Sequence, residues 1–317
     1  MAALDPDGRQ WLDLEVARRR AANADERLVH NDMVFRQPVT TLDDHLARGL
    51  RVAALGALLD ACKPRADDDA VLDGADLAFG SPVLRPSSVR DFYAFEKHVG
   101  TIWSRRDQEI PEAWFRLPIF YFSNVSEVRG PEDPVWPPNG SLELDYEMEI
   151  AALIDTPARD LSAARGAEAI GGFMIMNDWS ARDLQRDETT VRLGPAKGKD
   201  FATTFGPWLV TPDELADKIS GKAYDLACTT EVNGTILSRG NLNAIHHSFG
   251  AMVERASADA RLVPGDVIGS GTVGGGCLLE VKDESGFGRY LQPGDRVTMK
   301  VDRLGELSAP VVERPRQ

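Results

Sequence analysis

From about residue 86 onward, short apolar runs alternate with turn-rich segments, which is the pattern of β-strands joined by tight connections. Pro137-Pro138-Asn139-Gly140 and Gln292-Pro293-Gly294-Asp295 are two such turns. The pattern predicts an α+β protein whose larger domain is mostly β with few helices. The expected strands cover residues 119–123, 144–154, 172–176, 278–282 and 296–301.

The first eighty-odd residues have a different hydrophobic pattern, which predicts a small separate domain. Polar segments surround one amphipathic run, residues 45–62, in which the apolar positions approximate a helical stripe. A charged segment follows, and Pro82 and Pro86 then break the chain before the strand-rich part begins. We therefore place a small N-terminal domain at residues 1–85 and the larger domain at 86–317.

Acidic and apolar residues alternate strictly from Leu144 to Ile150. On a strand, this alternation puts Asp145, Glu147 and Glu149 on one face. Three neighbouring carboxylates repel one another unless water or a shared cation intervenes, and hard divalent ions take such oxygen ligands. The segment therefore indicates either a cation site or a solvated strand face.

A second acidic residue lies near a histidine, in the segment from Ser87 to His98. Ser88 and Asp91 have the spacing of a capping box, which predicts that a helix starts here. On such a helix, Asp91 and His98 would lie two turns apart on one face, where a metal ligand could accompany a general base. The alternative is a capping aspartate and an incidental histidine.

An apolar strand that ends at Asp178 is followed by a polar turn and a predicted helix. Arg182 and Gln185 are three residues apart and would share a face of that helix. A carboxylate, a guanidinium and an amide could then converge on one pocket. The alternative is that Asp178 or Ser180 caps the helix and the other groups are surface residues.

Composition excludes several functional classes. The formal net charge of −14 opposes binding to a nucleic-acid backbone. The apolar stretches are much shorter than the roughly 20 residues of a membrane-spanning helix, and we expect no membrane partner. Three widely spaced cysteines do not suggest a disulfide framework, so a soluble protein of the cytoplasm is expected.

Two glycine-rich segments resemble nucleotide-binding motifs only superficially. Residues 269–274 spell GxGxxG, but an apolar run follows in place of the helix that the dinucleotide fingerprint requires. Residues 194–200 have the wrong glycine spacing for a phosphate loop and carry Asp200 where a Ser or Thr belongs. The chain also lacks a GxSxG elbow and an HExxH pair, so serine-hydrolase and zinc-protease activities have no support.

Taken together, five blocks resemble those of the fumarylacetoacetate hydrolase family and occur in the same order. They are DFYAFEKH, LDYEMEIA, MNDWSARDLQ, GPAKGKDFATTFGPW and GSGT followed by LLE, within about residues 82 to 310. The resemblance implies that the larger domain has the mixed β-roll fold of this family and that the protein is a homodimer. It also implies one divalent cation, Mg²⁺ or Mn²⁺ with Ca²⁺ as an alternative.

The resemblance further implies roles for individual residues. The metal ligands would be Asp91, Glu147, Glu149 and Asp178. Asp145, on the same predicted face, would contact the metal ligands instead of the metal itself. His98, held by Glu280, would activate water. The groups that bind and stabilise the substrate would be Arg182, Gln185 and Lys199, with Tyr93 and Thr272 nearby.

The implied reaction is metal-dependent hydrolysis of a carbon–carbon bond in a small 1,3-diketo acid, such as an acylpyruvate or fumarylacetoacetate. A cation can bind both keto oxygens and stabilise the enolate that cleavage expels. One alternative is a decarboxylase of an oxaloacetate-like acid or a hydratase of a 2-keto-4-enoate on the same scaffold. The other is a non-catalytic acidic protein that binds cations.

Overall fold

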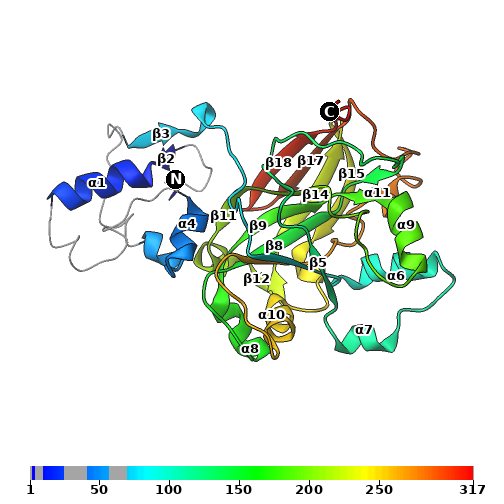
Figure 1. Cartoon of the computed structure of the whole chain (residues 1–317), viewed down its shortest axis with the longest axis horizontal. Coiled ribbons are helices and arrows are strands. Elements are labelled where there is room, and N and C mark those ends of the chain that lie inside the picture. The colour runs from blue at the N-terminus through cyan, green and yellow to red at the C-terminus, as the bar shows by residue number, and fades with distance from the viewer. Residues whose placement is uncertain (1, 4–9, 25–40, 57–69, 317) are drawn as a thin grey trace. The chain divides into compact units, whose positions relative to one another are not determined.

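The computed structural model describes residues 2–3, 10–24, 41–56 and 70–316. The chain divides into two compact units, Met1–Ala78 and Phe79–Gln317, whose elements are labelled in Figure 1. The division lies slightly N-terminal to the predicted boundary near residue 85. All the candidate site residues belong to the second unit.

The first unit contains a small antiparallel sheet in the order β1-β2-β3. The predicted helix at residues 45–62 is wrong in its described part, because α4 ends at Ala47 and Gly49 adopts a left-handed φ of 74° that a helix cannot continue through. A short helical segment resumes at residues 53–56, and residues 57–62 lie outside the described part of the chain. The elements of this unit are β1 (Ala2–Ala3), β2 (Gln10–Leu12), α1 (Leu14–Ala24), α4 (Leu42–Ala47), β3 (Val71–Asp73) and the 3₁₀ helix η1 (Gly74–Asp76).

The second unit is built on a seven-stranded mixed sheet with the order β5-β4-β16-β8-β9-β11-β6. The pairs β4–β16 and β6–β11 are parallel, and the other neighbours are antiparallel. The central strands β8 and β9 are fully buried, which explains their nearly continuous apolar sequences. The strands are β4 (Ser88–Phe92), β5 (Phe120–Ser123), β6 (Val128–Arg129), β8 (Met148–Ile154), β9 (Ile170–Asp178), β11 (Thr203–Val210) and β16 (Asp266–Gly269).

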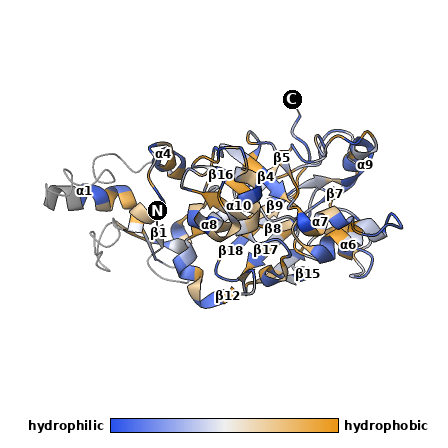
Figure 2. Cartoon of the chain, turned by 90° about the horizontal axis from the view of Figure 1, so that it is seen from below, coloured by the Kyte–Doolittle hydropathy of each residue, from blue (hydrophilic) through white to orange (hydrophobic). Residues whose placement is uncertain are grey.

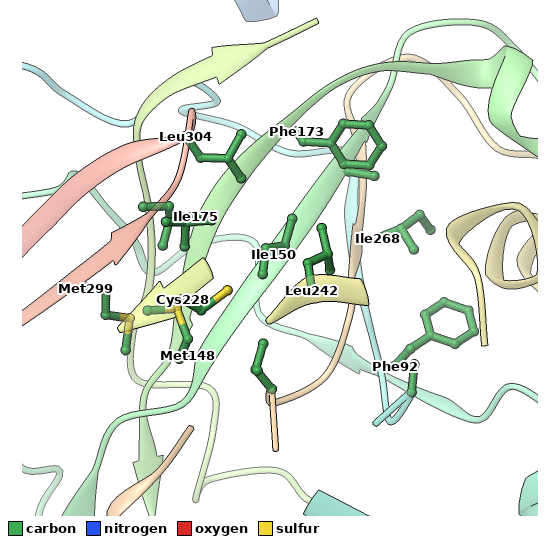
Figure 3. Packing of buried hydrophobic residues seen from close by; sticks show 14 of the residues in the cluster. Phe92, Met148, Ile150, Phe173, Ile175, Cys228, Leu242, Ile268, Met299 and Leu304 are labelled. Carbon is green, nitrogen blue, oxygen red and sulfur yellow. The ribbon is translucent and has the colours of Figure 1, made fainter. Parts of the chain in front are cut away.

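A four-stranded antiparallel sheet, in the order β15-β14-β17-β18, packs against β9 and β11 through β17 and β18, which are red in Figure 1. Figure 3 shows Ile175 of β9 beside Met299 of β17 and Leu304 of the turn between β17 and β18, within the main hydrophobic core. The strands are β14 (Ala227–Val232), β15 (Thr235–Asn241), β17 (Arg296–Val301) and β18 (Gly305–Pro310). Two short pairs complete the β-structure: β7 (Leu144–Asp145) with β10 (Ser180–Ala181), and β12 (Ile219–Ser220) with β13 (Ala223–Tyr224).

The helices of the second unit lie around these sheets. In α10, Phe249, Met252 and Val253 are buried, whereas α9 is mostly hydrophilic (Figure 2). No helix in the described part of the chain is long and apolar enough to cross a bilayer. The helices are α6 (Glu96–Ser104), α7 (Glu112–Arg116), α8 (Ala163–Gly166), η2 (Ala167–Ala169), α9 (Arg182–Thr190), η3 (Pro212–Lys218), η4 (Leu242–Ala244), α10 (Phe249–Ser257) and α11 (Leu278–Val281).

The structure confirms the predicted β-rich larger domain and several of its elements. The strands expected at 119–123, 172–176 and 296–301 are present as β5, β9 and β17, and the helix expected after Asp178 is α9. The strand expected at 144–154 is interrupted at Tyr146 and Glu147, so it forms β7 and β8.

Two predicted elements are wrong. Ser88 begins a strand instead of capping a helix, because β4 pairs with β5 and β16 and the Ser88 hydroxyl donates to Asp266. The helix starts only at Glu96. The strand predicted at 278–282 is instead the helical turn α11, because a short apolar run does not distinguish a buried strand from a buried helix.

Candidate active site

The large sheet brings three acidic residues from separate strands to one place. Asp91 lies near the end of β4, Glu149 lies in β8, and Asp178 is the last residue of β9. Gly269 of β16 pairs with Asp91, and a Cβ at that glycine would come within 2.6 Å of the Asp91 Oδ1 atom. The glycine therefore makes room for the carboxylate.

The carboxylate cluster formed by Asp91, Glu149 and Asp178 is buried, and one oxygen from each lies within 4.8 Å of the others. Burial first, and then the neighbouring negative charges, raise the pKa of Asp91 and of Glu149 well above the ordinary carboxyl range. Among the described side chains, the Oδ1 atoms of Asp91 and Asp178 are buried without a hydrogen-bond partner. Orphaned, converging carboxylate oxygens fit a hard divalent cation.

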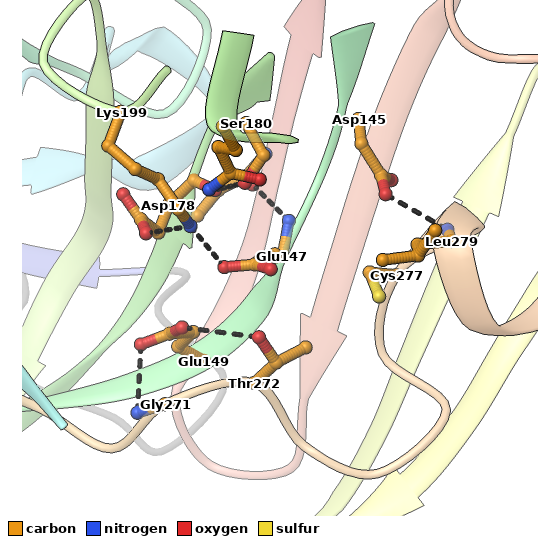
Figure 4. A network of polar contacts seen from close by, with 12 residues as sticks. Asp145, Glu147, Glu149, Asp178, Ser180, Lys199, Gly271, Thr272, Cys277 and Leu279 are labelled. Atoms are coloured by element: carbon orange, nitrogen blue, oxygen red, sulfur yellow. Dashed lines mark hydrogen bonds and ion pairs between the residues drawn. The ribbon is translucent and has the colours of Figure 1, made fainter. Parts of the chain in front are cut away.

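The fourth predicted ligand, Glu147, is joined to this cluster through a lysine. The Lys199 ammonium contacts both the Glu147 Oε2 and the Asp178 Oδ2 atoms (Figure 4). Burial alone would raise the pKa of Glu147, but the charges of Lys199 and Arg182 outweigh it and lower that pKa. Glu147 is therefore an anion that sits beside the cluster, balanced by two cations.

Arg182, at the start of α9, is almost completely buried and makes several polar contacts. Its Nε atom is 2.8 Å from Asp145, and its Nη1 atom is 2.7 Å from Glu147 and 3.1 Å from the amide oxygen of Gln185. Among the described side chains, its Nη2 atom is one of the buried donors without a partner. The helical spacing therefore does bring Arg182 and Gln185 together, and the Nη2 amino group, with its two N–H bonds, remains for a ligand.

His98 and Glu280 form a buried pair, in which the Nδ1 atom lies 2.8 Å from the Glu280 Oε2 atom. Burial opposes ionisation of Glu280, but the hydrogen bond and charge of His98 lower its pKa below the ordinary value. Since an ionised carboxylate can only accept, Nδ1 carries the proton. With Nδ1 directed at Glu280, Nε2 is the ring nitrogen that remains to accept a proton, as a general base needs.

The two remaining candidate residues lie close to these groups. The Tyr93 ring meets the His98 ring edge to face, with 5.4 Å between the centroids. The Thr272 hydroxyl is 3.5 Å from the Glu149 Oε1 atom, and Gly271 donates its N–H to Oε2 at 3.0 Å (Figure 4). The glycine-rich segment at residues 269–274 thus contacts the carboxylate cluster.

The predicted acidic face is wrong at one position. Asp145 lies in β7, before the strand interruption, and its carboxylate points away from Glu147 and Glu149 in Figure 4. It instead accepts from Arg182 and from the backbone of α11. The alternation rule fails here because it assumes one continuous strand.

Sequence reasoning missed two residues at the site. The Tyr121 hydroxyl donates to the Asp178 Oδ2 atom at 2.6 Å, and β5 places Tyr121 opposite Asp91. The Cys277 thiol lies 3.4 Å from the Glu280 Oε2 atom. The phenolic hydroxyl between two phenylalanines in the predicted strand at 119–123 was the only local signal for Tyr121, and none pointed to Cys277.

Comparison with known proteins matches most of the second unit to one family. Residues 87–312 match the family described as fumarylacetoacetate (FAA) hydrolase C-terminal. The fumarylacetoacetase of Arabidopsis thaliana is 29% identical over 269 residues, a match that covers 66% of this chain and 63% of the relative. The chain thus spans less than two thirds of that curated enzyme.

Solved structures of hydrolases and isomerases are also similar. The fumarylacetoacetate hydrolase of Exiguobacterium antarcticum has a TM-score of 0.65 and 26% identity, covering 86% of this chain and 88% of that one. The 5-carboxymethyl-2-hydroxymuconate delta-isomerase of Mycobacterium smegmatis has a TM-score of 0.60 and 31% identity, covering 77% and 83%.

Proposed function

The chain belongs to the fumarylacetoacetate hydrolase family, and from that premise we propose that it is a cation-dependent hydrolase of a small 1,3-diketo acid. The bond it cleaves is a carbon–carbon bond, as in an acylpyruvate or fumarylacetoacetate. The observation that carries the proposal is the buried His98–Glu280 pair, because hydrolysis needs a base that takes a proton from water, whereas decarboxylation through a stabilised enolate needs no attacking water.

The carboxylate cluster would hold the cation, Mg²⁺ or Mn²⁺ with Ca²⁺ as an alternative, through Asp91, Glu149 and Asp178, with Glu147 as the fourth ligand. When bound, such an ion polarises the keto oxygens of the substrate and stabilises developing negative charge. Lys199 and the free N–H of Arg182 supply further positive charge within reach of the same carboxylates.

His98 takes a proton from water at its Nε2 atom, while Glu280 stabilises the resulting imidazolium. The water oxygen adds to one keto carbon, and the carbon–carbon bond then breaks with its electron pair moving to the adjacent enolate. Lys199, Arg182 and Gln185 are the donors that would stabilise this charge. Protonation of the enolate carbon by the imidazolium returns His98 to its neutral form, so the protons balance.

An activity screen with a matched pair of variants tests the proposal. The Mg²⁺ and Mn²⁺ forms would be offered acylpyruvates, fumarylacetoacetate, fumarylpyruvate and oxaloacetate, with a chelated sample as the blank. His98→Ala and His98→Gln should both lose turnover by about 10²- to 10⁴-fold with KM little changed, although glutamine can still donate to Glu280. Turnover near the wild-type level in His98→Gln would refute water activation by His98.

A second candidate function is a cation-dependent isomerase, decarboxylase or hydratase on the same scaffold. The similarity to the Mycobacterium smegmatis isomerase supports it. Decarboxylation needs a stabilised enolate but no attacking water, so a decarboxylase would tolerate loss of His98. A hydratase adds water and an isomerase moves a proton, so both would still need an acid–base group. Carbon dioxide release from oxaloacetate, or conversion of a substrate without cleavage, would identify one of these enzymes. If no substrate were turned over in the presence of a cation, a non-catalytic cation-binding protein would be favoured.

We also propose that the protein acts in the cytoplasm as a homodimer, as the family resemblance implies. Sedimentation velocity at micromolar concentration measures the oligomeric state directly. A monomer under those conditions would contradict the dimer and leave the proposed chemistry intact.

A further inference from the structure

Asp145 is a fully buried carboxylate that links two parts of the candidate active site. Its Oδ1 atom accepts the backbone N–H of Leu278 at 2.7 Å. Its Oδ2 atom accepts the N–H of Leu279 at 2.9 Å and the Nε–H of Arg182 at 2.8 Å. Three donors converge on one carboxyl group, and they come from two segments that are far apart in the sequence.

The first of these segments carries Glu280. Leu278 and Leu279 open α11 and immediately precede Glu280, and the N-cap residue Cys277 makes no side-chain cap hydrogen bond. The first N–H groups of a helix have no acceptor within the helix, so an outside acceptor is needed to fix the turn. The Asp145 carboxylate in β7 supplies this acceptor to both Leu278 and Leu279.

The second segment carries Arg182. The guanidinium has a planar fork of donors, so fixing two of its nitrogens also fixes the third. Asp145 holds Nε, and Glu147 with Gln185 holds Nη1. The direction of the unpartnered Nη2 donor therefore depends on the Asp145 carboxylate.

We propose that Asp145 is a positioning residue that sets Arg182 and the Glu280-bearing turn at once, so that substrate binding and water activation depend on one buried carboxylate. This inference rests on the proposed function for its kinetic consequences. Its geometric content, that Asp145 fixes the Glu280–His98 hydrogen bond, can be tested without activity.

The main variant is Asp145→Asn, which keeps the size of the side chain but replaces one acceptor oxygen by an NH₂ group facing existing donors. We expect KM to rise through Arg182 and kcat to fall through Glu280, with kcat/KM reduced by about 10- to 100-fold, as small misplacements of reacting groups produce. In a Glu280→Gln background, the effect of Asp145→Asn on kcat should shrink, because both changes act on the same base.

Asp295→Asn is the matched control. Asp295 is also a buried aspartate that pairs with an arginine, Arg289 at 2.6 Å, and accepts a backbone N–H, from Gln292 at 2.8 Å. It lies in the turn before β17 and contacts none of the candidate site residues among the described contacts. This control should lose stability while keeping wild-type KM and kcat.

The activity-independent measurement is proton NMR of the His98 Nδ1–H group, assigned by its loss in His98→Ala. Asp145→Asn should move this resonance upfield or broaden it by exchange with water, whereas Asp295→Asn should leave it unchanged. If the wild-type protein turns over no substrate in the panel, the proposed function fails, and this resonance alone decides the inference. An unchanged resonance in folded Asp145→Asn overturns it.

If Asp145→Asn does not fold, Leu279→Pro replaces it. Proline is tolerated in the first turn of a helix and removes one N–H donor to Asp145 while keeping the carboxylate. Because this variant leaves the contact with Arg182, kcat should fall and KM should stay near the wild-type value. Unchanged kcat, or a rise in KM alone, would overturn the inference.

Discussion

Glu149→Gln should have opposite effects on stability in the absence and in the presence of a divalent cation. Glu149 is fully buried and shares the carboxylate cluster with Asp91 and Asp178. At the 4.8 Å limit of the cluster, two unit negative charges repel by about 3.5 kcal/mol for an effective dielectric constant of 20. The raised pKa of Glu149 means that protonation already relieves part of this repulsion.

The neutral amide removes this repulsion at nearly constant shape. In chelator, the Tm of Glu149→Gln should therefore equal or exceed that of the wild-type protein. With Mn²⁺ at 100 times the wild-type Kd, binding stabilises the wild-type protein by about 2.7 kcal/mol, which raises the Tm of a unit of this size by about 5–11 °C. A variant that binds tenfold more weakly gains only about 1.4 kcal/mol, or about 3–6 °C.

Differential scanning fluorimetry with EDTA and with Mn²⁺ measures both effects. Asp183→Asn is the control, because Asp183 accepts from Ser141 and Leu142 and lies outside the cluster. It should keep the full Mn²⁺ shift. A lower Tm of Glu149→Gln in EDTA together with an undiminished Mn²⁺ shift would refute both the like-charge repulsion and the assignment of Glu149 as a ligand.

Two further predictions concern pH and the backbone of the site. Because the pKa values of Asp91 and Glu149 are raised, the folded cation-free protein binds more protons than the unfolded chain, so its stability should fall as pH rises above about 4.5. Cation binding displaces those protons, so the Mn²⁺ shift in Tm should grow from pH 5 to 8, and a shift independent of pH would contradict the raised values. Gly271→Ala should destabilise the protein by more than the roughly 1–3 kcal/mol of left-handed strain, because its φ is 78° and its Cβ would lie 2.5 Å from the Phe92 carbonyl oxygen. Gly140→Ala measures the strain alone, because Gly140 has a φ of 85° and open space around it. Equal losses in the free energy of unfolding of the two variants, measured in urea, would show that the close approach is unimportant.

Local sequence patterns determined much of the fold of the second unit. Strands β5, β9 and β17 and helix α9 were predictable because hydrophobic periodicity and turn residues act within a few positions of one another. The pairing of Arg182 with Gln185 followed from the same local geometry. The order of the five sequence blocks indicated the family, and the family resemblance supplied the roles of the individual residues.

Only the tertiary structure decided how distant segments meet. Ser88 and Asp91 have the local signature of a helix start, but pairing of β4 with two neighbouring strands stabilises the extended form. Asp145 turns away from the acidic face because the strand breaks at Tyr146, where Arg182 and α11 offer donors that alternation cannot reveal. Tyr121 reaches Asp178 across 57 positions of sequence, a contact that depends on sheet register and on no local pattern.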